Sequence, residues 1–397
     1  MLISINIILF GVGILLLISV LLSKLSAYIG VPTLIVFLLL GLVIDFGKFI
    51  QPTVDNYMLV QYVSIFAMII IMFSGGLDTD FKKMKPIRAQ GISLASVGVF
   101  ITAFVTGGLI HLISGIDLFL SFLIGATISS TDAASVFSIF RNNNTKLKNK
   151  LDNILELESA TNDPTAYILT TSLIFLILHP TTSFWELALM FIQSIVFGAI
   201  IGFIFGRVFS KYIKSIKLDV DGLYPVLLFG VAIFTFACSE MIGGNGFLAV
   251  FISAVIIGNR FLPYKKSQTT FFEGLAWLMQ VIMFIILGLF TLPNELVATA
   301  GISFLTAVII IFISRPIAVF ATLMPFDIDF KSKIFLSWTG IKGAVPIVFA
   351  FYPLVYEIPG AILVFNTVFF VTIISLLLQG STIYFVADKL NLISNSD

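Results

Sequence analysis

Charge is what this sequence has least of. Only 11% of its 397 residues are charged and 59% are hydrophobic, whereas a soluble domain carries about 25% charged residues. The mean hydropathy is +1.11. One crossing of a bilayer takes about 20 apolar residues, so a chain of this length has room for many crossings. The composition therefore predicts an all-α polytopic membrane protein and argues against a soluble enzyme or binding domain.

Cysteine, histidine and net charge are also scarce. Cys238 is the single cysteine, so neither a disulfide framework nor a cysteine-based metal cluster is expected. His111 and His179 fall at the edges of predicted spans, which does not favour zinc ligation. A net charge of +1 gives no electrostatic case for nucleic acid. No Walker loop is present that would hold ATP, and no cofactor is expected.

Hydropathy predicts about 13 membrane spans. They lie near residues 2–22, 31–49, 57–76, 87–113, 117–140, 150–178, 184–209, 221–241, 246–262, 271–291, 297–323, 332–352 and 359–386. Nearly all loop Lys and Arg fall on one side of these spans, and the other side has only Lys48. By the positive-inside rule the N-terminus should lie outside and the C-terminus in the cytoplasm. We expect one membrane domain over 1–390 and a short cytoplasmic tail over 391–397, with any regulatory domain outside this chain.

Two of the predicted spans are interrupted by small and polar residues. The fifth span carries Asp132 near its middle, and the twelfth carries Lys342 between two glycines. Each is the fifth span of a six-span half, and a central seventh span gives the two halves opposite orientations. This pattern predicts two inverted six-helix repeats whose broken helices 5 and 12 cross near the midplane. Asp132 at a positive helix end and Lys342 at a negative one would compensate the helix dipoles there.

The sixth span begins with a polar stretch that runs from Glu156 to Thr165. A carboxylate at membrane depth costs roughly 2.5–3.5 kcal/mol on insertion scales, so several polar groups there predict a functional site. Asp163 is the deeper acid and shares a helix face with Ser159. Asp132 is the natural second oxygen ligand, with the Thr131 carbonyl and hydroxyl beside it, because hard cations take oxygen ligands. A polar network that only holds helices together is the alternative.

The remaining acids of the site need other roles. Glu158 should be paired, because an unpaired buried acid costs several kcal/mol. The two bases inside predicted spans are Arg315 and Lys342, and the sequence leaves open which of them is the partner. Glu156 is expected in the mouth of a negative funnel at the cytoplasmic end. Glu240 could be an acid of an outer funnel or a cap of the helix that follows it.

These motifs together resemble the monovalent cation:proton antiporters of the NhaP/NHE-like type (cation:proton antiporter-1). The resemblance covers the whole chain and rests on five motifs in the family's order. They are Thr131-Asp132, the run Glu158–Pro164, the run Gly244–Ala249, Ser314-Arg315-Pro316 and the run Trp338–Ala344. The departure is Lys342, where the family usually has Arg, so the pairing of Glu158 could move to Arg315.

The resemblance implies a homodimer in the plasma membrane with a function in pH homeostasis. A core domain would comprise spans 4–6 and 11–13, a dimerisation domain would comprise spans 1–3 and 7–10, and access would alternate by an elevator-like motion. Carried over by position, Asp163 binds the ion or the proton. Further ligands of Na⁺ or K⁺ would be Asp132, Thr131 and Ser159, and Glu158 would belong to a buried ion pair. Asn162 is similar to the residue of the electroneutral branch and would hold or tune the site.

The expected function is exchange of a monovalent cation, Na⁺ or K⁺, for a proton. Asp163 would bind one or the other, and no enzymatic activity is expected. Two other hypotheses use the same residues. A cation channel would line a continuous pore with these acids. An intramembrane aspartyl protease would need two facing aspartates, which Asp132 and Asp163 could supply.

Overall fold

The computed structural model describes residues 33–45, 54–142, 145–216 and 218–395, with a few single positions between 6 and 20. Most of the predicted first span, 2–22, therefore lies outside the described residues, and so does the end of the second. The described part consists of helices joined by turns and loops, with one small sheet. The predicted all-α fold class is confirmed.

Helices of the first half follow the predicted spans closely. They are α2 (Thr33–Asp45), α3 (Val54–Asp78), α4 (Phe81–Met84), the 3₁₀ turn η1 (Lys85–Ile87), α5 (Arg88–Ser93), the π-helical turn η2 (Leu94–Gly98), α6 (Val99–Ser114), α7 (Leu118–Thr127), α8 (Ala133–Asn142), α9 (Leu151–Leu178) and α10 (Phe184–Ser215). Asp117 begins α7 by accepting hydrogen bonds from the amides of Phe119 and Leu120. Ser183 and Glu186 form a capping box at the start of α10.

Helices of the second half match the remaining spans. They are α11 (Leu223–Met241), α12 (Gly246–Gly258), α13 (Lys265–Leu289), α14 (Pro293–Ile309), the π-helical turn η3 (Ile310–Ser314), α15 (Arg315–Thr322), α16 (Phe330–Trp338), α17 (Val345–Val355), α18 (Ala361–Ser375), the π-helical turn η4 (Leu376–Gly380) and α19 (Ser381–Lys389). Helix α13 begins earlier than predicted because its first turns are polar, and hydropathy reports membrane depth rather than helix length.

Both predicted interruptions are present. The fifth span is divided into α7 and α8, and the twelfth into α16 and α17. By length and composition, seven helices among the described residues can each cross a membrane, and α7 and α17 are among the shorter apolar helices. The broken spans are thus built from half-helices. The number of spans and their orientation in the membrane stay predictions.

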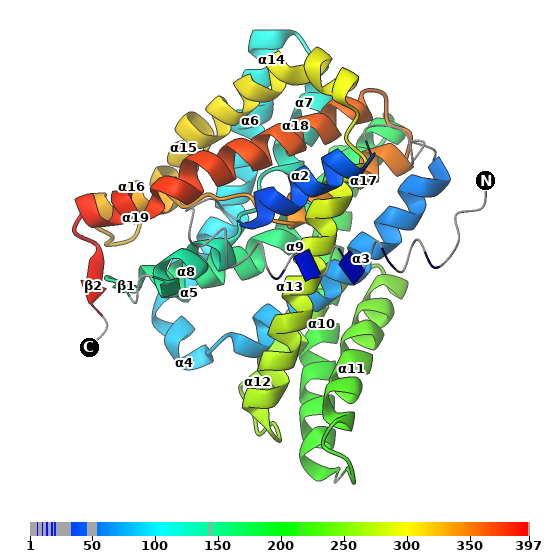
Figure 1. The fold of residues 1–397 in the computed structure, drawn as a ribbon, viewed down its shortest axis with the longest axis vertical. Helices are drawn as coiled ribbons and strands as arrows, with labels where there is room; N and C mark the ends of the chain where they lie inside the picture. The colour runs from blue at the N-terminus through cyan, green and yellow to red at the C-terminus, as the bar shows by residue number, and fades with distance from the viewer. Residues whose placement is uncertain are drawn as a thin grey trace.

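The helices pack in two groups that meet along α9 and where α17 lies against α3. Helices α2, α3 and α10–α13 contact mainly one another. At Gly198 and Gly202 of α10, an added Cβ would lie 2.6 Å from the carbonyl oxygens of Asn245 and Ala249, so only glycine allows α10 and α12 to approach this closely. Helices α6, α7, α9, α14, α17 and α18 form the second group. In Figure 1, α14, α15, α18 and α19 lie in the upper part, and α10 and α11 extend to the bottom.

A two-stranded antiparallel sheet joins distant parts of the chain. Strand β1 (Thr145–Leu147) pairs with β2 (Ile393–Asn395), with Lys146 opposite Ser394. The residues just after α19 are therefore held against the loop between α8 and α9 (Figure 1).

Candidate functional site

Helix α9 carries the polar stretch through the interior of the molecule. Glu158 and Asn162 are each 1% exposed, and Asp163 is 4% exposed. Pro164 lies inside the helix without ending it. Oδ1 of Asp163 and Oδ1 of Asn162 are buried and have no hydrogen-bond partner among the described residues. The helix thus presents two unpaired oxygens one residue apart, at a place where unpaired polar atoms are costly.

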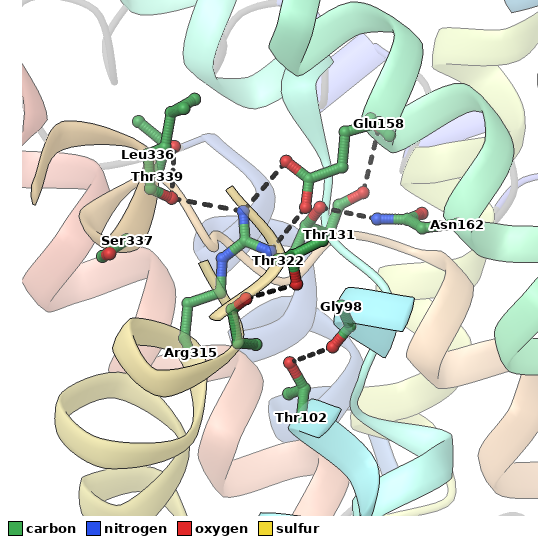
Figure 2. Close-up of polar contacts among 12 residues, drawn as sticks. Gly98, Thr102, Thr131, Glu158, Asn162, Arg315, Thr322, Leu336, Ser337 and Thr339 are labelled. Carbon is green, nitrogen blue, oxygen red and sulfur yellow. Dashed lines mark hydrogen bonds and ion pairs between the residues drawn. The ribbon is translucent and has the colours of Figure 1, made fainter. Parts of the chain in front are cut away.

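The interruption between α7 and α8 is held by side chains of α9. The amide of Asn162 donates to the Thr131 hydroxyl at 2.7 Å, and the Ser159 hydroxyl donates to the Thr131 carbonyl at 2.9 Å. The Ser159 oxygen also accepts from the amide of Ala133 at 3.1 Å. Figure 2 shows Asn162 directed at Thr131. The predicted residues Thr131, Ser159 and Asn162 are therefore brought together, and they satisfy backbone groups that the break leaves free.

Asp132 stands at the start of α8. Its carboxylate accepts from the Ala134 amide at 2.9 Å and from the Ser135 hydroxyl at 2.6 Å, so it lies at the positive end of a helix. Its side chain is partly exposed, and its charge acts on that of Asp163. An added Cβ on Gly343 would lie 2.6 Å from Asp132 Oδ2. The second broken helix thus fits against this carboxylate with no room for a side chain.

Direct hydrogen bonds join the two broken helices where they cross. The amide of Asp132 donates to the carbonyl of Ile341 at 2.8 Å. The Lys342 ammonium donates to the carbonyl of Ser130 at 2.9 Å, and Lys342 is 2% exposed. Ser130 lies just past the C-terminal end of α7, where unpaired carbonyl groups form the negative end of the helix dipole. A base in the break between α16 and α17 thus compensates the negative end of the α7 dipole in the other broken helix.

Glu158 pairs with Arg315 and not with Lys342. Arg315 Nη1 and Nη2 donate to the two carboxylate oxygens of Glu158, the second at 3.0 Å, and Nη2 also donates to the carbonyl of Leu336 at 3.2 Å. Both side chains are buried. Figure 2 shows this fork facing Glu158 from α15. The alternative left open by the sequence is resolved because the planar guanidinium of Arg315 meets both oxygens of Glu158, while the Lys342 ammonium is bound to the Ser130 carbonyl.

Ser375 and Gln379 support the second break and were not singled out in the sequence. The Ser375 hydroxyl accepts from the amide of Lys342 at 3.0 Å and donates to Gln379 Oε1 at 2.6 Å. The Gln379 amide donates to the carbonyl of Trp338 at 2.8 Å. Both side chains are fully buried in the apolar helix formed by α18 and the turn η4. An amide and a hydroxyl four residues apart in an otherwise apolar span were the signal that could have revealed them.

Asn245 in the turn before α12 and Glu240 at the end of α11 both contact the start of α12. Asn245 caps α12 by accepting from the Leu248 amide at 2.9 Å, and its own amide donates to the carbonyl of Pro164 at 3.0 Å. Glu240 accepts from the amide of Gly246 at 2.7 Å. Of the two roles considered for Glu240, the capping of α12 is therefore the one that the geometry supports. The contact from Asn245 to the helix that carries Asp163 was not foreseen.

Glu156 lies two turns before Asp163 on α9 and is partly exposed. The charged groups that act on it are Lys83, Asp152, Asp78 and Asp80. Lys83 has the largest effect among them, and the three acids act against it. The funnel role of Glu156 stays a prediction.

Two broken helices that cross beside a buried carboxylate are the architecture of secondary transporters. The family described as "Sodium/hydrogen exchanger, transmembrane" matches residues 13–389. The chain belongs to this family. It is therefore a multi-pass membrane protein of an antiporter family, and that family is one of transporters rather than enzymes.

Similar proteins include antiporters for different cations. The K⁺/H⁺ antiporter NhaP of Alkalimonas amylolytica is 35% identical over 389 residues, which cover 98% of this chain and 68% of that protein. The K⁺/H⁺ antiporter NhaP2 of Shewanella baltica is 34% identical over 369 residues, covering 92% of this chain and 64% of that protein. The chain thus spans about two thirds of the length of these relatives.

Two further likenesses extend over nearly the full length of both proteins. The Na⁺/H⁺ antiporter NhaH of Halobacillus aidingensis is 27% identical over 397 residues, covering 95% of this chain and 96% of that protein. The sodium proton antiporter MjNhaP1 of Methanocaldococcus jannaschii, in a structure at pH 8, superposes with a TM-score of 0.86 and 22% identity, covering 98% of this chain and 99% of that one. This last likeness concerns the fold.

Proposed function

We propose that this chain is a secondary active antiporter of the plasma membrane that exchanges K⁺ or Na⁺ for H⁺ by competition at Asp163. The observation that carries the proposal is the carboxylate of Asp163. It is buried, its Oδ1 has no partner among the described residues, and it lies in α9 beside the crossing of the broken helices. A buried carboxylate is costly unless its charge is neutralised. A proton or a cation can each do so, and one excludes the other.

The cation would take its other oxygen ligands from the first broken helix. Asp132 supplies a second carboxylate, and Thr131 and Ser159 supply hydroxyl and carbonyl oxygens. The Thr131 carbonyl accepts one hydrogen bond from Ser159, and a carbonyl oxygen has a second lone pair that can face an ion. Asn162 carries no charge and would hold Thr131 in place. With Asp163 as the acid that exchanges its ligand, one cation replaces one proton, and transport is electroneutral.

The buried bases have structural roles in this proposal. Arg315 neutralises Glu158, so that acid is not free to bind the transported ion. Lys342 is held at the carbonyl of Ser130. Glu156, which is partly exposed two turns before Asp163 on α9, would attract cations at the mouth of the site.

Access would alternate by movement of one helix group against the other. The core would comprise spans 4–6 and 11–13, which include the broken helices, α9 and α14–α19. The dimerisation domain would comprise spans 1–3 and 7–10, which include α10–α13, and would join two copies of the chain. The division of helix contacts into two groups supports this assignment. The burial of Asp163 favours alternating access over a channel, because a continuous pore would leave the acid open to water.

The substitution Asp163→Asn tests the proposal. An amide keeps the size of the carboxylate but can neither bind a proton nor hold a cation by charge, so exchange should fall to the background of empty vesicles. The measurement is collapse of an imposed proton gradient in proteoliposomes on addition of K⁺, Na⁺ or Li⁺. Asp117→Asn is the matched control, since Asp117 is an exposed helix cap and Asn also caps well. Exchange retained in the Asp163→Asn protein would sink the assignment.

A further inference from the structure

The turn before α12 contains a buried amide that joins the two helix groups. Asn245 is 1% exposed. Its backbone amide donates to the carbonyl of Ser194 in α10 at 2.8 Å, and its side-chain oxygen caps α12 through the Leu248 amide. Its remaining group, the side-chain NH₂, donates to the carbonyl of Pro164 in α9 at 3.0 Å. One residue thus contacts three helices.

The backbone of Asn245 is fixed to α10. An added Cβ on Gly198 would lie 2.6 Å from the Asn245 carbonyl oxygen, and one on Gly244 would lie 2.7 Å from the Gly198 amide. Close contact of this kind leaves the turn little freedom to move against α10. The position of the Asn245 side chain is therefore set by the α10–α12 pair and not by α9.

The other end of the bond lies next to the ion-binding acid. Pro164 follows Asp163 directly, and both are buried in α9. A hydrogen bond to the Pro164 carbonyl holds the backbone of the turn that carries Asp163. Because the site is buried, water would not replace the Asn245 side-chain NH₂ as a donor to the Pro164 carbonyl if that donor were lost.

We propose that Asn245 is a positioning residue, whose side-chain amide holds the Asp163–Pro164 turn against α12 and so stabilises the conformation seen here relative to the conformation open to the other side of the membrane. The inference rests on the proposed function, in which α9 moves relative to α10 and α12. The bond must then break in each transport cycle. It therefore sets part of the free-energy difference between the two conformations.

Asn245→Ser separates this role from helix capping. Serine retains an oxygen that caps α12 but has no amide to reach Pro164. Loss of a single hydrogen bond should shift the conformational equilibrium about two- to tenfold. A ligand's apparent affinity scales with the population of the conformation that binds it. The apparent KM for the cation should therefore rise on one membrane face and fall on the other.

The measurement is cation-dependent exchange in right-side-out and inside-out vesicles, with melting temperature recorded for each variant. Asn245→Ser should melt near the wild-type temperature and show opposite KM shifts on the two faces. Asn245→Ala, which also loses the cap, should show the same KM shifts and a lower melting temperature. If the Asn245→Ser protein does not fold, Asn245→Asp is measured in its place. It keeps the cap and places an acceptor against the Pro164 carbonyl, so it should shift KM in the same sense as expected for Asn245→Ser, and further.

Two results would overturn the inference. One is a folded Asn245→Ser or Asn245→Asp protein with wild-type KM on both faces. The other is a fall in maximal rate that is equal on both faces with KM unchanged, which a merely structural defect would produce. Wild type and Asp163→Asn are measured in parallel, because absence of wild-type exchange would count against the proposed function itself. Wild-type exchange with unshifted variants would count against Asn245 alone.

Discussion

At the scale of single residues, Glu158 and Arg315 form a buried ion pair. Two hydrogen bonds join the guanidinium to the carboxylate, and a third ties it to the carbonyl of Leu336. The pair links α9 to α15 and to the end of α16. A buried ion pair adds little net stability over apolar residues, but breaking it leaves an uncompensated charge. Loss of one partner should therefore lower the stability of the fold more than it lowers the exchange activity of the folded protein.

Replacement of one partner should destabilise more than replacement of both. Glu158→Gln or Arg315→Met leaves one buried group unpaired and should cost about 3–5 kcal/mol. The double variant Glu158→Leu with Arg315→Met should recover much of that loss. Melting temperatures in detergent test this, with Glu186→Gln as the control because Glu186 is exposed. A double variant less stable than either single variant would contradict the expectation.

At the scale of elements, the broken helices α7–α8 and α16–α17 support each other. Side chains of α9 hold the first break, and Ser375 and Gln379 hold the second. The π-helical turn η4 begins directly after Ser375 and includes Gln379, and π-helical turns of this kind often occur at functional sites. The two breaks meet where Gly343 lies against Asp132. The position of the Asp132 carboxylate thus depends on the absence of a side chain on the other broken helix.

Gly343→Ala should displace Asp132. The added methyl would lie 2.6 Å from the carboxylate, closer than van der Waals contact allows, so the break must shift. Overpacking of a buried site costs typically 1–3 kcal/mol, and exchange should fall strongly even in the folded fraction. Gly301→Ala is the control: a Cβ there meets nothing within 4 Å, and alanine favours a helix by up to about 1 kcal/mol. Equal exchange rates per folded protein in the two variants would refute the role of this contact.

At the scale of the whole molecule, the loop charges predict how the chain lies in the membrane. The last turns of α10 carry Lys211 and Lys214, and the start of α14, at the predicted opposite end of the spans, carries Glu295. Basic residues are retained on the cytoplasmic side. The termini should follow, with the N-terminus outside and the C-terminus inside.

Cysteine labelling tests this orientation. In a Cys238→Ser background, a cysteine in place of Lys214 should react with a membrane-impermeant reagent only in inside-out vesicles. A cysteine in place of Glu295 should react only in right-side-out vesicles. Both positions are exposed, so access of the reagent is not limited by burial. The reverse labelling pattern would invert the predicted topology.

Much of the fold could be predicted because its signals are local. The length of an apolar run, the energetic cost of a carboxylate in lipid and the effect of glycine and proline on a helix are properties of about 20 residues at a time. The polar stretch of α9 and the interruptions near Asp132 and Lys342 were visible for this reason. The resemblance of the motifs to a family followed from the same stretches. Helix ends were less certain, as the early start of α13 shows.

The sequence by itself determined that the chain is a helical membrane protein with two broken spans and a set of buried acids at their crossing. Only the tertiary structure decided which groups meet. Glu158 pairs with Arg315, the Lys342 ammonium donates to the carbonyl of Ser130, and the Asn245 amide donates to the carbonyl of Pro164. These contacts join residues far apart in the chain, and each depends on distances and on the directions of single donors. No local pattern encodes them, because hydropathy is the same for every arrangement of the same helices.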